Sequence, residues 1–340
     1  MKFYYISTNN SYPQNRHLID GLRKNGHEVF EVEEKGQGIG KYIKIIRKFW
    51  PQRRFYDTVI IGLASPHFVP IIRLIFFKKI VYNGGYSQYE ANVVSRGINK
   101  KITWWLKDFI SFWLSSKILL ESNSQIDYVH KLFFVPKKKL IRAWAGVNEK
   151  VFFVDNNIKK MDKFTVLFRG RFLPESGILT VVKTAKLLED KNIDFLVIGV
   201  GFLHKEYNEL MNKLKPKNFT LLTKRFSEKE LREKMLACHI SLGQMANHPR
   251  LSRTLPCKLF ESLALKLPYL TARNTGVLEL LKENETCLAV EPANSNKLAE
   301  KILHLKNNPE ILEKIAKQGH ELYKEKLTSK KLAKDFIDNL

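Results

Sequence analysis

The sequence predicts an α/β fold made of two doubly wound, Rossmann-like domains, each built on a parallel sheet. Short apolar runs alternate with segments of helical periodicity along all 340 residues, which is typical of right-handed βαβ units. The chain is also longer than a single hydrophobic core usually supports, and at about 150 residues per domain its length suggests two domains. Because open parallel sheets bind ligands at the carboxyl ends of their strands, we expect the two domains to face a central cleft.

The predicted elements follow from runs of apolar and β-branched residues, which indicate strands, and from longer amphipathic segments between them, which indicate helices. In the first half the predicted strands lie at 2–7, 27–32, 57–62, 79–82, 117–121 and 139–143. The predicted helices between them lie at about 16–25, 41–49, 67–77, 98–114 and 124–133.

In the second half the predicted strands lie at 164–169, 195–200, 219–222, 239–243, 268–271 and 286–290, again with helices between them. The polar stretch 151–163 has no clear periodicity, which is typical of a linker. We therefore expect an N-terminal domain over 1–155 and a C-terminal domain over 156–325. A C-terminal helix over 326–340 is expected to cross back to the first domain.

The charge is strongly basic. Lys and Arg number 58 against 34 Asp and Glu, a net charge of +24. Residues 1–160 carry 27 basic and 12 acidic side chains, an excess of 15. A field of this size indicates an anionic partner: nucleic acid, an acidic lipid surface or a phosphorylated substrate.

Several other classes are disfavoured by the sequence. Three cysteines without metal-ligand spacing indicate neither a disulfide framework nor a zinc site. The first residues, MKFYYIS, lead into a polar stretch rather than the apolar core of a signal peptide. No apolar run is long enough to span a bilayer. We expect a cytoplasmic protein.

The loops after the predicted strands of the second half hold candidate anion ligands. Gly170 allows a turn after the strand at 164–169, and Arg171 then presents its forked donors; the alternative is a surface pair with Glu175. Gly201 belongs to a GVG turn after the next strand, a pattern that more often marks a tight turn.

The loop over 247–265 is the most informative. Pro256 suits a first helical turn, so a helix should begin there with its N–H groups exposed to an anion. Arg253 and Lys258 put positive charge where the helix dipole already disfavours it, which suggests a bound phosphate, and Glu261 adds a carboxylate suited to a ribose diol. A surface Arg–Glu–Lys cluster is the alternative. Thr275 and Gly276 begin another helix in the next loop.

These motifs carry a family resemblance. The order of GR at 170–171, Gly177, GVG at 199–201 and PCKLFESLALKLPYLTARNTGVLEL resembles the donor domain of retaining GT-B glycosyltransferases of family 4. The stretch 115–153, ending in GVNEKVFF, resembles the family's approach to its interdomain linker. The resemblance implies the GT-B fold and transfer of a sugar from a nucleotide-diphosphate sugar, with a UDP-sugar favoured, and with retention of configuration.

The resemblance also implies residue roles. Arg171 would contact the diphosphate and Glu261 the ribose, with Gly170, Gly201, Arg253, Lys258, Thr275 and Gly276 completing the donor-binding set. Two positions depart from the family pattern: Arg253 stands where many members have a first glutamate, and Ser176 where many have a lysine. Our hypothesis is that Arg253 or Lys258 supplies the lost positive charge.

The expected chemistry needs no metal ion. Departure of a nucleoside diphosphate develops negative charge, which fixed cations and a helix N-terminus stabilise, and no DxD-like carboxylate cluster is present in the sequence. We therefore predict metal independence and assign Arg171, Lys258 and His67 as catalytic candidates. His67 follows the strand at 57–62, although a lone histidine is more often structural.

The first half supplies the acceptor candidates. Polar loops follow its first and fourth strands, and the residues there that could bind a glycan or lipid-linked acceptor are Arg16, Ser87, Tyr89, Glu90 and Arg96.

Two segments of the first half have the character of membrane-surface helices. The segment 39–55 combines Lys41, Lys44 and Lys48 with bulky apolar residues that end at Trp50, and the segment 98–114 carries Trp104 and Trp105 behind lysines. Basic amphipathic helices with aromatic residues bind anionic lipid surfaces in plane. We expect peripheral association with the inner face of the cell membrane; the alternatives are a solvated basic face for the first helix and burial for the second.

Two other functions remain open from sequence. A nucleic-acid-acting protein, either a DNA-modifying glycosyltransferase or a binding module, would use the same basic field, but no nucleic-acid-binding motif is present, so we expect no nucleic acid partner. A sugar-nucleotide epimerase on the same fold would turn over the donor without an acceptor.

Overall fold

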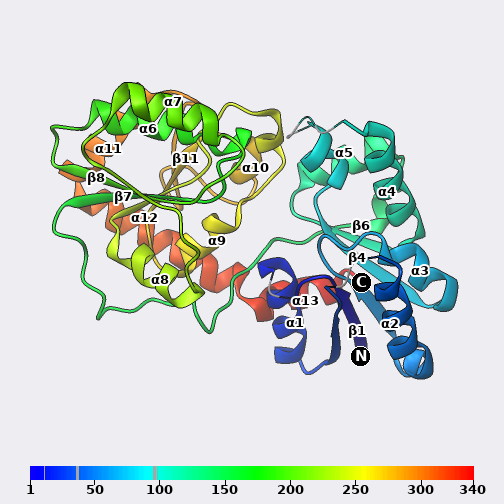
Figure 1. Cartoon of the computed structure of the whole chain (residues 1–340). Helices are drawn as coiled ribbons and strands as arrows, with labels where there is room; N and C mark the ends of the chain where they lie inside the picture. Colours follow the sequence, from blue (N-terminus) through cyan, green and yellow to red (C-terminus); the bar gives the residue numbers. More distant parts are fainter. Residues whose placement is uncertain (11, 36–37, 95–96, 98) are drawn as a thin grey trace. The chain divides into compact units, whose positions relative to one another are not determined.

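The computed structural model describes residues 1–340 except 11, 36–37, 95–96 and 98. The chain forms two compact units, one of Met1–Asn148 with Lys326–Leu340 and the other of Glu149–Glu325. Each unit contains one six-stranded parallel sheet (Figure 1). The predicted α/β class with two doubly wound domains is confirmed, and each predicted strand overlaps a strand of the structure.

The first unit is built on the sheet order β2-β1-β3-β4-β5-β6. Its strands are β1 (Lys2–Ser7), β2 (Glu28–Glu33), β3 (Thr58–Ile61), β4 (Lys79–Gly85), β5 (Lys117–Leu120) and β6 (Leu140–Arg142). Its helices are α1 (Pro13–Lys24), α2 (Gly40–Phe49), α3 (Phe68–Ile75), α4 (Lys101–Leu114), α5 (Asn123–Phe133) and α13 (Ser329–Asp338).

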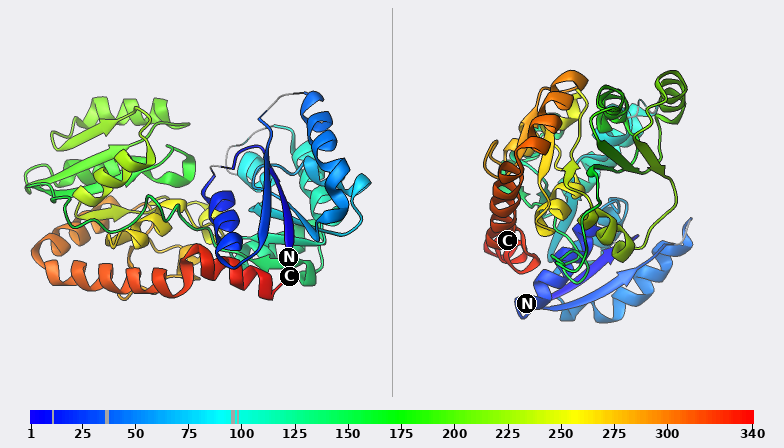
Figure 2. Two further views of the ribbon diagram at one scale, coloured as in Figure 1. Left: turned by 90° about the horizontal axis from the view of Figure 1, so that it is seen from below. Right: turned by 90° about the vertical axis from the view of Figure 1, so that its left-hand side faces the viewer.

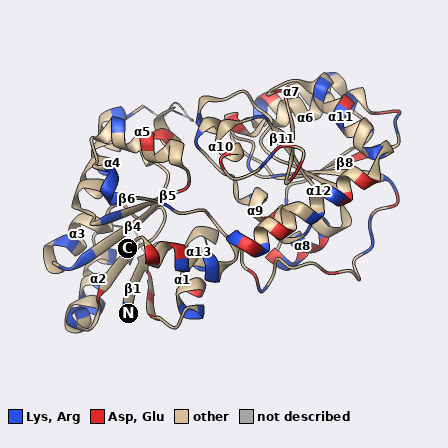
Figure 3. Ribbon diagram, turned by 180° about the vertical axis from the view of Figure 1, so that it is seen from behind, with Lys and Arg blue, Asp and Glu red and all other residues tan. Residues whose placement is uncertain are grey.

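The two faces of this sheet are covered by different helices. α2, α3, α4 and α5 pack one after another on one face, over a core that contains Phe49, Ile72, Phe112 and Phe133. α1 and α13 cover the other face through Leu22 and other apolar residues. This arrangement follows from right-handed crossovers, because the chain reverses direction across the sheet between β2 and β3. Lys and Arg recur along α2, α3 and α4 (Figure 3).

The second unit is built on the sheet order β12-β11-β10-β7-β8-β9. Its strands are β7 (Phe164–Arg169), β8 (Ile193–Ile198), β9 (Phe219–Leu222), β10 (Ile240–Leu242), β11 (Tyr269–Ala272) and β12 (Leu288–Val290). Its helices are α6 (Ile178–Leu187), α7 (His204–Leu214), α8 (Glu228–Ala237), α9 (Cys257–Ala264), α10 (Thr275–Leu278), α11 (Ser295–Asn307) and α12 (Pro309–Leu322).

The polar stretch 151–163 differs from the expected linker. Asp155 forms an ion pair with Arg232 of α8 at 3.2 Å, and the amine of Lys160 donates to the carbonyls of Leu236 and Cys238. The segment is therefore held along α8 and belongs to the second unit. Its lack of periodicity reflects an irregular backbone fixed by hydrogen bonds rather than a loose connection.

The C-terminal helix α13 lies alongside α1, about three hundred residues earlier in the sequence (Figure 2). The Lys24 amine donates to the Ser329 hydroxyl at 3.0 Å, and the Asn25 amide donates to the Lys330 carbonyl at 2.9 Å. Gly21 allows the close approach, because a Cβ there would overlap the Ser329 carbonyl and the Ala333 side chain.

We predict that Gly21→Leu separates α13 from α1 and destabilises the first unit by about 1–3 kcal/mol, the usual range for overpacking. Chemical denaturation followed by circular dichroism measures the change. Gly40→Ala is the control, because a Cβ at Gly40 meets no atom within 4 Å. An unchanged free energy of unfolding for Gly21→Leu would contradict the assigned contact.

Candidate functional site

The strand order of the second unit places the candidate site. The order reverses between β7 and β10, so the loops that follow these two strands diverge from a common edge of the sheet. Ligands of open parallel sheets bind at such a reversal, outside the carboxyl ends of the strands. The loops concerned are 170–177 after β7 and 243–256 after β10, which contain several of the predicted residues.

The loop after β7 is shaped by glycines. Gly170 has φ 137° and Gly177 has φ 76°, backbone conformations that favour glycine. A Cβ at Gly199 would overlap the Gly170 carbonyl, and one at Gly201 would overlap the Phe172 backbone. The GVG turn therefore packs directly against this loop and fixes its course. It also ends β8 at Ile198, two residues before the predicted end.

Arg171 is exposed and its side chain forms no ion pair or hydrogen bond within the described residues. The alternative that it pairs with Glu175 is not what the structure shows. Glu175 is buried and instead pairs with Arg250, Nη1 to Oε1 at 2.5 Å. That ion pair ties the loop after β7 to the turn 249–252, while the Arg171 guanidinium stays available to a ligand.

A buried charge cluster lies at the end of β7. Arg169, the last residue of the strand, forms an ion pair with Glu261 of α9. Burial lowers the pKa of the Arg169 guanidinium. Sequence reasoning missed Arg169, although an arginine that ends the apolar run FTVLFR was a visible signal. The carboxylate assigned to a ribose is thus already paired with a cation.

Lys258 is buried rather than presented at the helix start. Its amine donates to the Gly243 carbonyl at 2.8 Å and lies 4.3 Å from the centre of the Phe168 ring. Burial and the Arg169 charge lower its pKa well below the ordinary lysine value. The prediction that Lys258 is a catalytic and donor-binding cation finds no support in this position, because its amine caps the end of β10.

The remaining predicted donor residues gather on two neighbouring loops. α9 begins at Cys257, directly after Pro256, where the sequence predicts a helix start. Arg253 is half-buried just before it, and its guanidinium donates to the Ser252 hydroxyl at 3.2 Å. Gly276 lies so close to the backbone of 251–254 that a Cβ would overlap it, and the Thr275 hydroxyl donates to the Ser252 carbonyl.

The first unit has its own strand reversal, between β1 and β3. Arg16, predicted to bind an acceptor, pairs there with Glu31 at 3.0 Å and Asp20 at 3.3 Å, so its charge is satisfied within the unit. His67 packs against the rings of Tyr42 and Phe68. Burial, with smaller contributions from nearby lysines, lowers the pKa of His67 to about 4, so its ring is neutral near pH 7.

The loop after β4 is organised around Asp108 of α4. The carboxylate accepts a hydrogen bond from the Ser87 hydroxyl at 2.7 Å and one from the Tyr89 backbone N–H at 2.9 Å. Ser87 and Glu90 are fully buried, which argues for a structural role rather than the predicted acceptor contact. The Tyr89 ring packs edge-on against Phe133. Arg96 lies outside the described residues.

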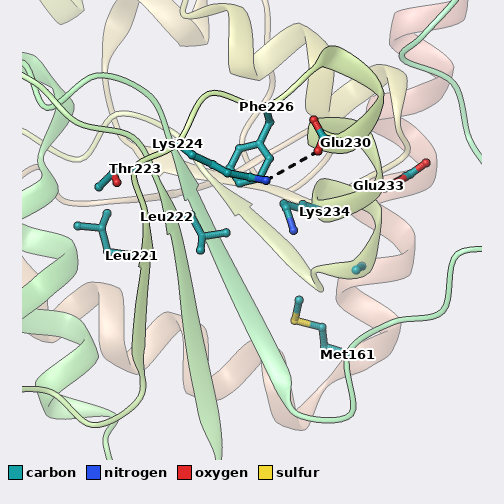
Figure 4. Close-up of a pocket in the computed structure, with 10 residues that line it drawn as sticks. Met161, Leu221, Leu222, Thr223, Lys224, Phe226, Glu230, Glu233 and Lys234 are labelled. Carbon is teal, nitrogen blue, oxygen red and sulfur yellow. Dashed lines mark ion pairs between the residues drawn. The ribbon is translucent and has the colours of Figure 1, made fainter.

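A pocket of about 710 Å³ lies beside the end of the edge strand β9 (Figure 4). Phe226 lies between two amines, with Lys224 at 5.0 Å and Lys234 at 5.1 Å from its ring centre. Lys224 also pairs with Glu230 at 4.0 Å. The sequence analysis did not single out these residues; an aromatic residue after a strand and between two lysines was the available signal.

Two other features are absent from the described residues. No group of three or more His, Cys, Asp and Glu side chains that could hold a metal ion occurs among them. Within the same residues, no helix has the length and apolar character needed to cross a bilayer.

Comparison with known proteins gives concordant matches. The sequence model of the family described as glycosyl transferases group 1 matches residues 150–322. An uncharacterized glycosyltransferase of Methanocaldococcus jannaschii is 27% identical over 188 residues, which cover 55% of this chain and only half of that protein. The capsular polysaccharide biosynthesis glycosyltransferase CapM of Staphylococcus aureus is 22% identical, with 96% of this chain and 93% of CapM covered.

Among solved structures, Anabaena HepE, crystallised with UDP and with UDP-glucose, has the same fold. The TM-score is 0.74 with 13% identity, and the match to the UDP complex covers 99% of both chains.

We predict that Arg250→Met destabilises the second unit by about 3–5 kcal/mol, because it leaves the Glu175 carboxylate buried without its guanidinium partner. Chemical denaturation measures the loss. Lys297→Met, which breaks the exposed pair with Glu300, is the control and should cost less than about 1 kcal/mol. Equal effects of the two substitutions would mean that the buried pair does not hold the loops together.

Burial raises the pKa of Asp108 to about 7. Between the ordinary carboxyl pKa and this value the folded state binds more protons than the unfolded state, so stability falls as the pH rises through this window and levels off above it. We predict that Asp108→Asn removes this decline, measured by denaturation at several pH values. Asp127→Asn, at an exposed site where Lys137 lowers the pKa, should leave the decline in place; an unaltered profile in Asp108→Asn would refute the assignment.

Proposed function

Since the chain belongs to the glycosyl transferases group 1 and is a glycosyltransferase, we propose that it moves a sugar from a nucleotide-diphosphate sugar, with a UDP-sugar favoured, to a glycan or lipid-linked acceptor. Transfer proceeds with retention of configuration and without a metal ion, and the protein acts peripherally at the inner face of the cell membrane. The UDP and UDP-glucose complexes of HepE support the donor, and the capsular polysaccharide role in the name of CapM supports a glycan acceptor.

The observation that carries the proposal is the exposed guanidinium of Arg171 at the strand reversal of the second unit, which has no partner among the described residues. A guanidinium binds phosphate oxygens in a forked geometry. The start of α9 and the neighbouring Arg253 lie on the loop after β10, on the other side of the same reversal. Together they provide the fixed positive charge that a departing nucleoside diphosphate requires.

The pocket beside β9 suits the nucleoside of the donor. β9 is two strands from β7, about 10 Å along the sheet edge. Phe226 offers a ring for stacking, and Lys224 and Lys234 keep the surroundings positive. In this arrangement the diphosphate lies at the ends of β7 and β10 and the base lies toward β9.

The residue roles differ from the first expectation for Lys258 and Glu261. Lys258 holds the end of β10 through Gly243, so Arg171 and Arg253 are the cations that we assign to the diphosphate. Glu261 approaches the ribose while paired with Arg169. Arg253 is then the charge that compensates for the lysine replaced by Ser176.

We predict that Arg171→Ala weakens donor binding by about 10- to 100-fold, the usual effect of losing a hydrogen bond to a charged group, without lowering the melting temperature of the unliganded protein. Thermal shift with UDP-, GDP- and ADP-sugars measures binding, and Lys213→Ala on the exposed surface of α7 is the control. Arg253→Ala should weaken binding in the same thermal-shift assay and lower turnover, followed as release of the nucleoside diphosphate.

Arg171 is a better probe than Glu261, because Glu261→Ala would also remove the ion-pair partner of the largely buried Arg169. If no nucleotide sugar stabilises the wild-type protein, the donor site is refuted. If Arg253→Ala binds and turns over donor normally, the compensation by Arg253 is refuted, while the role of Arg171 stands. Sugar-nucleotide turnover without any acceptor would indicate an epimerase.

A further inference from the structure

The outer face of α4 is apolar, although no part of the chain that the structure describes covers it. The inner face packs on the sheet through Asp108, Ser111 and Phe112, all buried. The opposite face carries an apolar stripe with the spacing i, i+4, i+8, i+11, whose members are between 41% and 76% exposed: Ile102, Leu106, Ile110 and Trp113. A surface helix of a globular protein normally turns polar residues outward.

The stripe differs from the aromatic pair that the sequence suggested. Trp105 stacks on Phe109 and Phe133, so it belongs to the packing between α4 and α5. Trp104 is half-buried with the Lys107 amine 4.3 Å from its ring centre. Trp113 instead lies on the outer face, and its indole N–H donates to the Phe133 carbonyl at 3.0 Å, which fixes the ring at the surface.

Neighbouring elements extend the apolar surface. Leu74 and Phe77, at the end of α3, and Phe134, just after α5, are between 71% and 85% exposed. α3 and α5 flank α4 in the helical layer (Figure 1). The C-terminal end of α4 is held by hydrogen bonds from two neighbouring segments.

Two basic side chains donate these hydrogen bonds. The guanidinium of Arg73 in α3 donates to the Leu114 carbonyl at 3.0 Å, and the amine of Lys139 donates to the Trp113 carbonyl at 2.8 Å. The outward residues of α3, α4 and α5 thus stand on one rigid layer. We call this set the α3–α5 apolar surface: Leu74, Phe77, Ile102, Leu106, Ile110, Trp113 and Phe134.

The charges around this surface have one sign. Residues 68–141 contain 12 Lys and Arg but only 4 Asp and Glu. Three of these acidic residues are buried, namely Glu90, Asp108 and Glu121. Asp127 is paired with Lys137 at 2.6 Å. The layer therefore presents apolar side chains surrounded by cations. Among its described residues, Asp127 is the one exposed acidic side chain that could neutralise them, and it is paired with Lys137.

We infer that the α3–α5 apolar surface is the part of the chain that enters an anionic phospholipid bilayer, with α4 lying in the plane of the interface. Exposed Leu, Ile, Phe and Trp side chains gain from burial among acyl chains, and lysines around them are attracted to anionic headgroups. Contacts to nucleic acid phosphates would need the cations but not the apolar stripe. The inference names the membrane-binding surface for the proposed function. It rests on that proposal, which places the acceptor at a membrane.

Sedimentation with phosphatidylcholine vesicles, with and without phosphatidylglycerol, tests the inference on the full chain at physiological salt. The wild-type protein should bind vesicles that contain phosphatidylglycerol and bind pure phosphatidylcholine much more weakly. The double substitutions Leu106→Glu with Ile110→Glu, and Leu74→Ser with Phe77→Ser, should each reduce binding by about tenfold or more. Lys101→Glu with Lys138→Glu should reduce it by a similar factor and reduce its salt dependence.

Matched controls come from the second unit. Leu187→Glu changes a comparably exposed leucine on α6, and Lys205→Glu with Lys213→Glu reverses two exposed lysines on α7. Both variants should bind vesicles like the wild type. The inference is overturned if the wild-type protein does not bind anionic vesicles, or if both apolar double variants bind them normally. It is also overturned if the protein binds duplex DNA, but not vesicles, in a parallel assay.

Thermal shift with a UDP-sugar on the same samples separates this inference from the proposed function. It also verifies that each variant is folded. Nucleotide-sugar binding without vesicle binding would refute the membrane surface and leave the donor site intact. Vesicle binding without nucleotide-sugar binding would refute the donor site and support the membrane surface.

Discussion

A largely buried ion pair at the end of a central strand is the constraint on which the second unit's site depends. Arg169 ends β7 with most of its side chain buried, and the buried Glu261 of α9 pairs with it. Such a pair is tolerated only when both partners stay in place. It therefore fixes α9 relative to β7, and with α9 it fixes the loop that carries Arg253. Lys258 adds to the same constraint by capping β10.

The neighbouring loop is held by a second buried pair and by glycines. Glu175 and Arg250 connect the turn after β7 to the turn after β10, while Gly199 and Gly201 support the backbone from β8. Because the buried charges of these loops pair with one another, the exposed Arg171 is the loop cation that remains available to a ligand. In the function proposed above, this guanidinium meets the negative charge that develops on the departing nucleoside diphosphate.

The first unit uses its two sheet faces differently. One face takes the C-terminal helix α13 against α1, an approach that requires Gly21. The helices on the other face bury one apolar side against the sheet and, in α4, expose another. The stripe from Ile102 to Trp113 was readable as helical spacing, but the sequence alone could not say which of the apolar faces of this helix meets the sheet. Of the Trp104–Trp105 pair that the sequence suggested, Trp105 packs on Phe133 of α5 and Trp104 is half-buried.

The sequence by itself determined the α/β class, the strands, the start of α9 and the family, because apolar periodicity and the order of short motifs are local properties of the chain. Only the tertiary structure decided which charges are paired. Glu175 joins Arg250 rather than Arg171, Arg16 joins Glu31 and Asp20, and Ser87 serves Asp108. The physical reason is that burial and ion pairing depend on residues far apart in sequence, and on distances of a few ångströms that only the packed sheets establish.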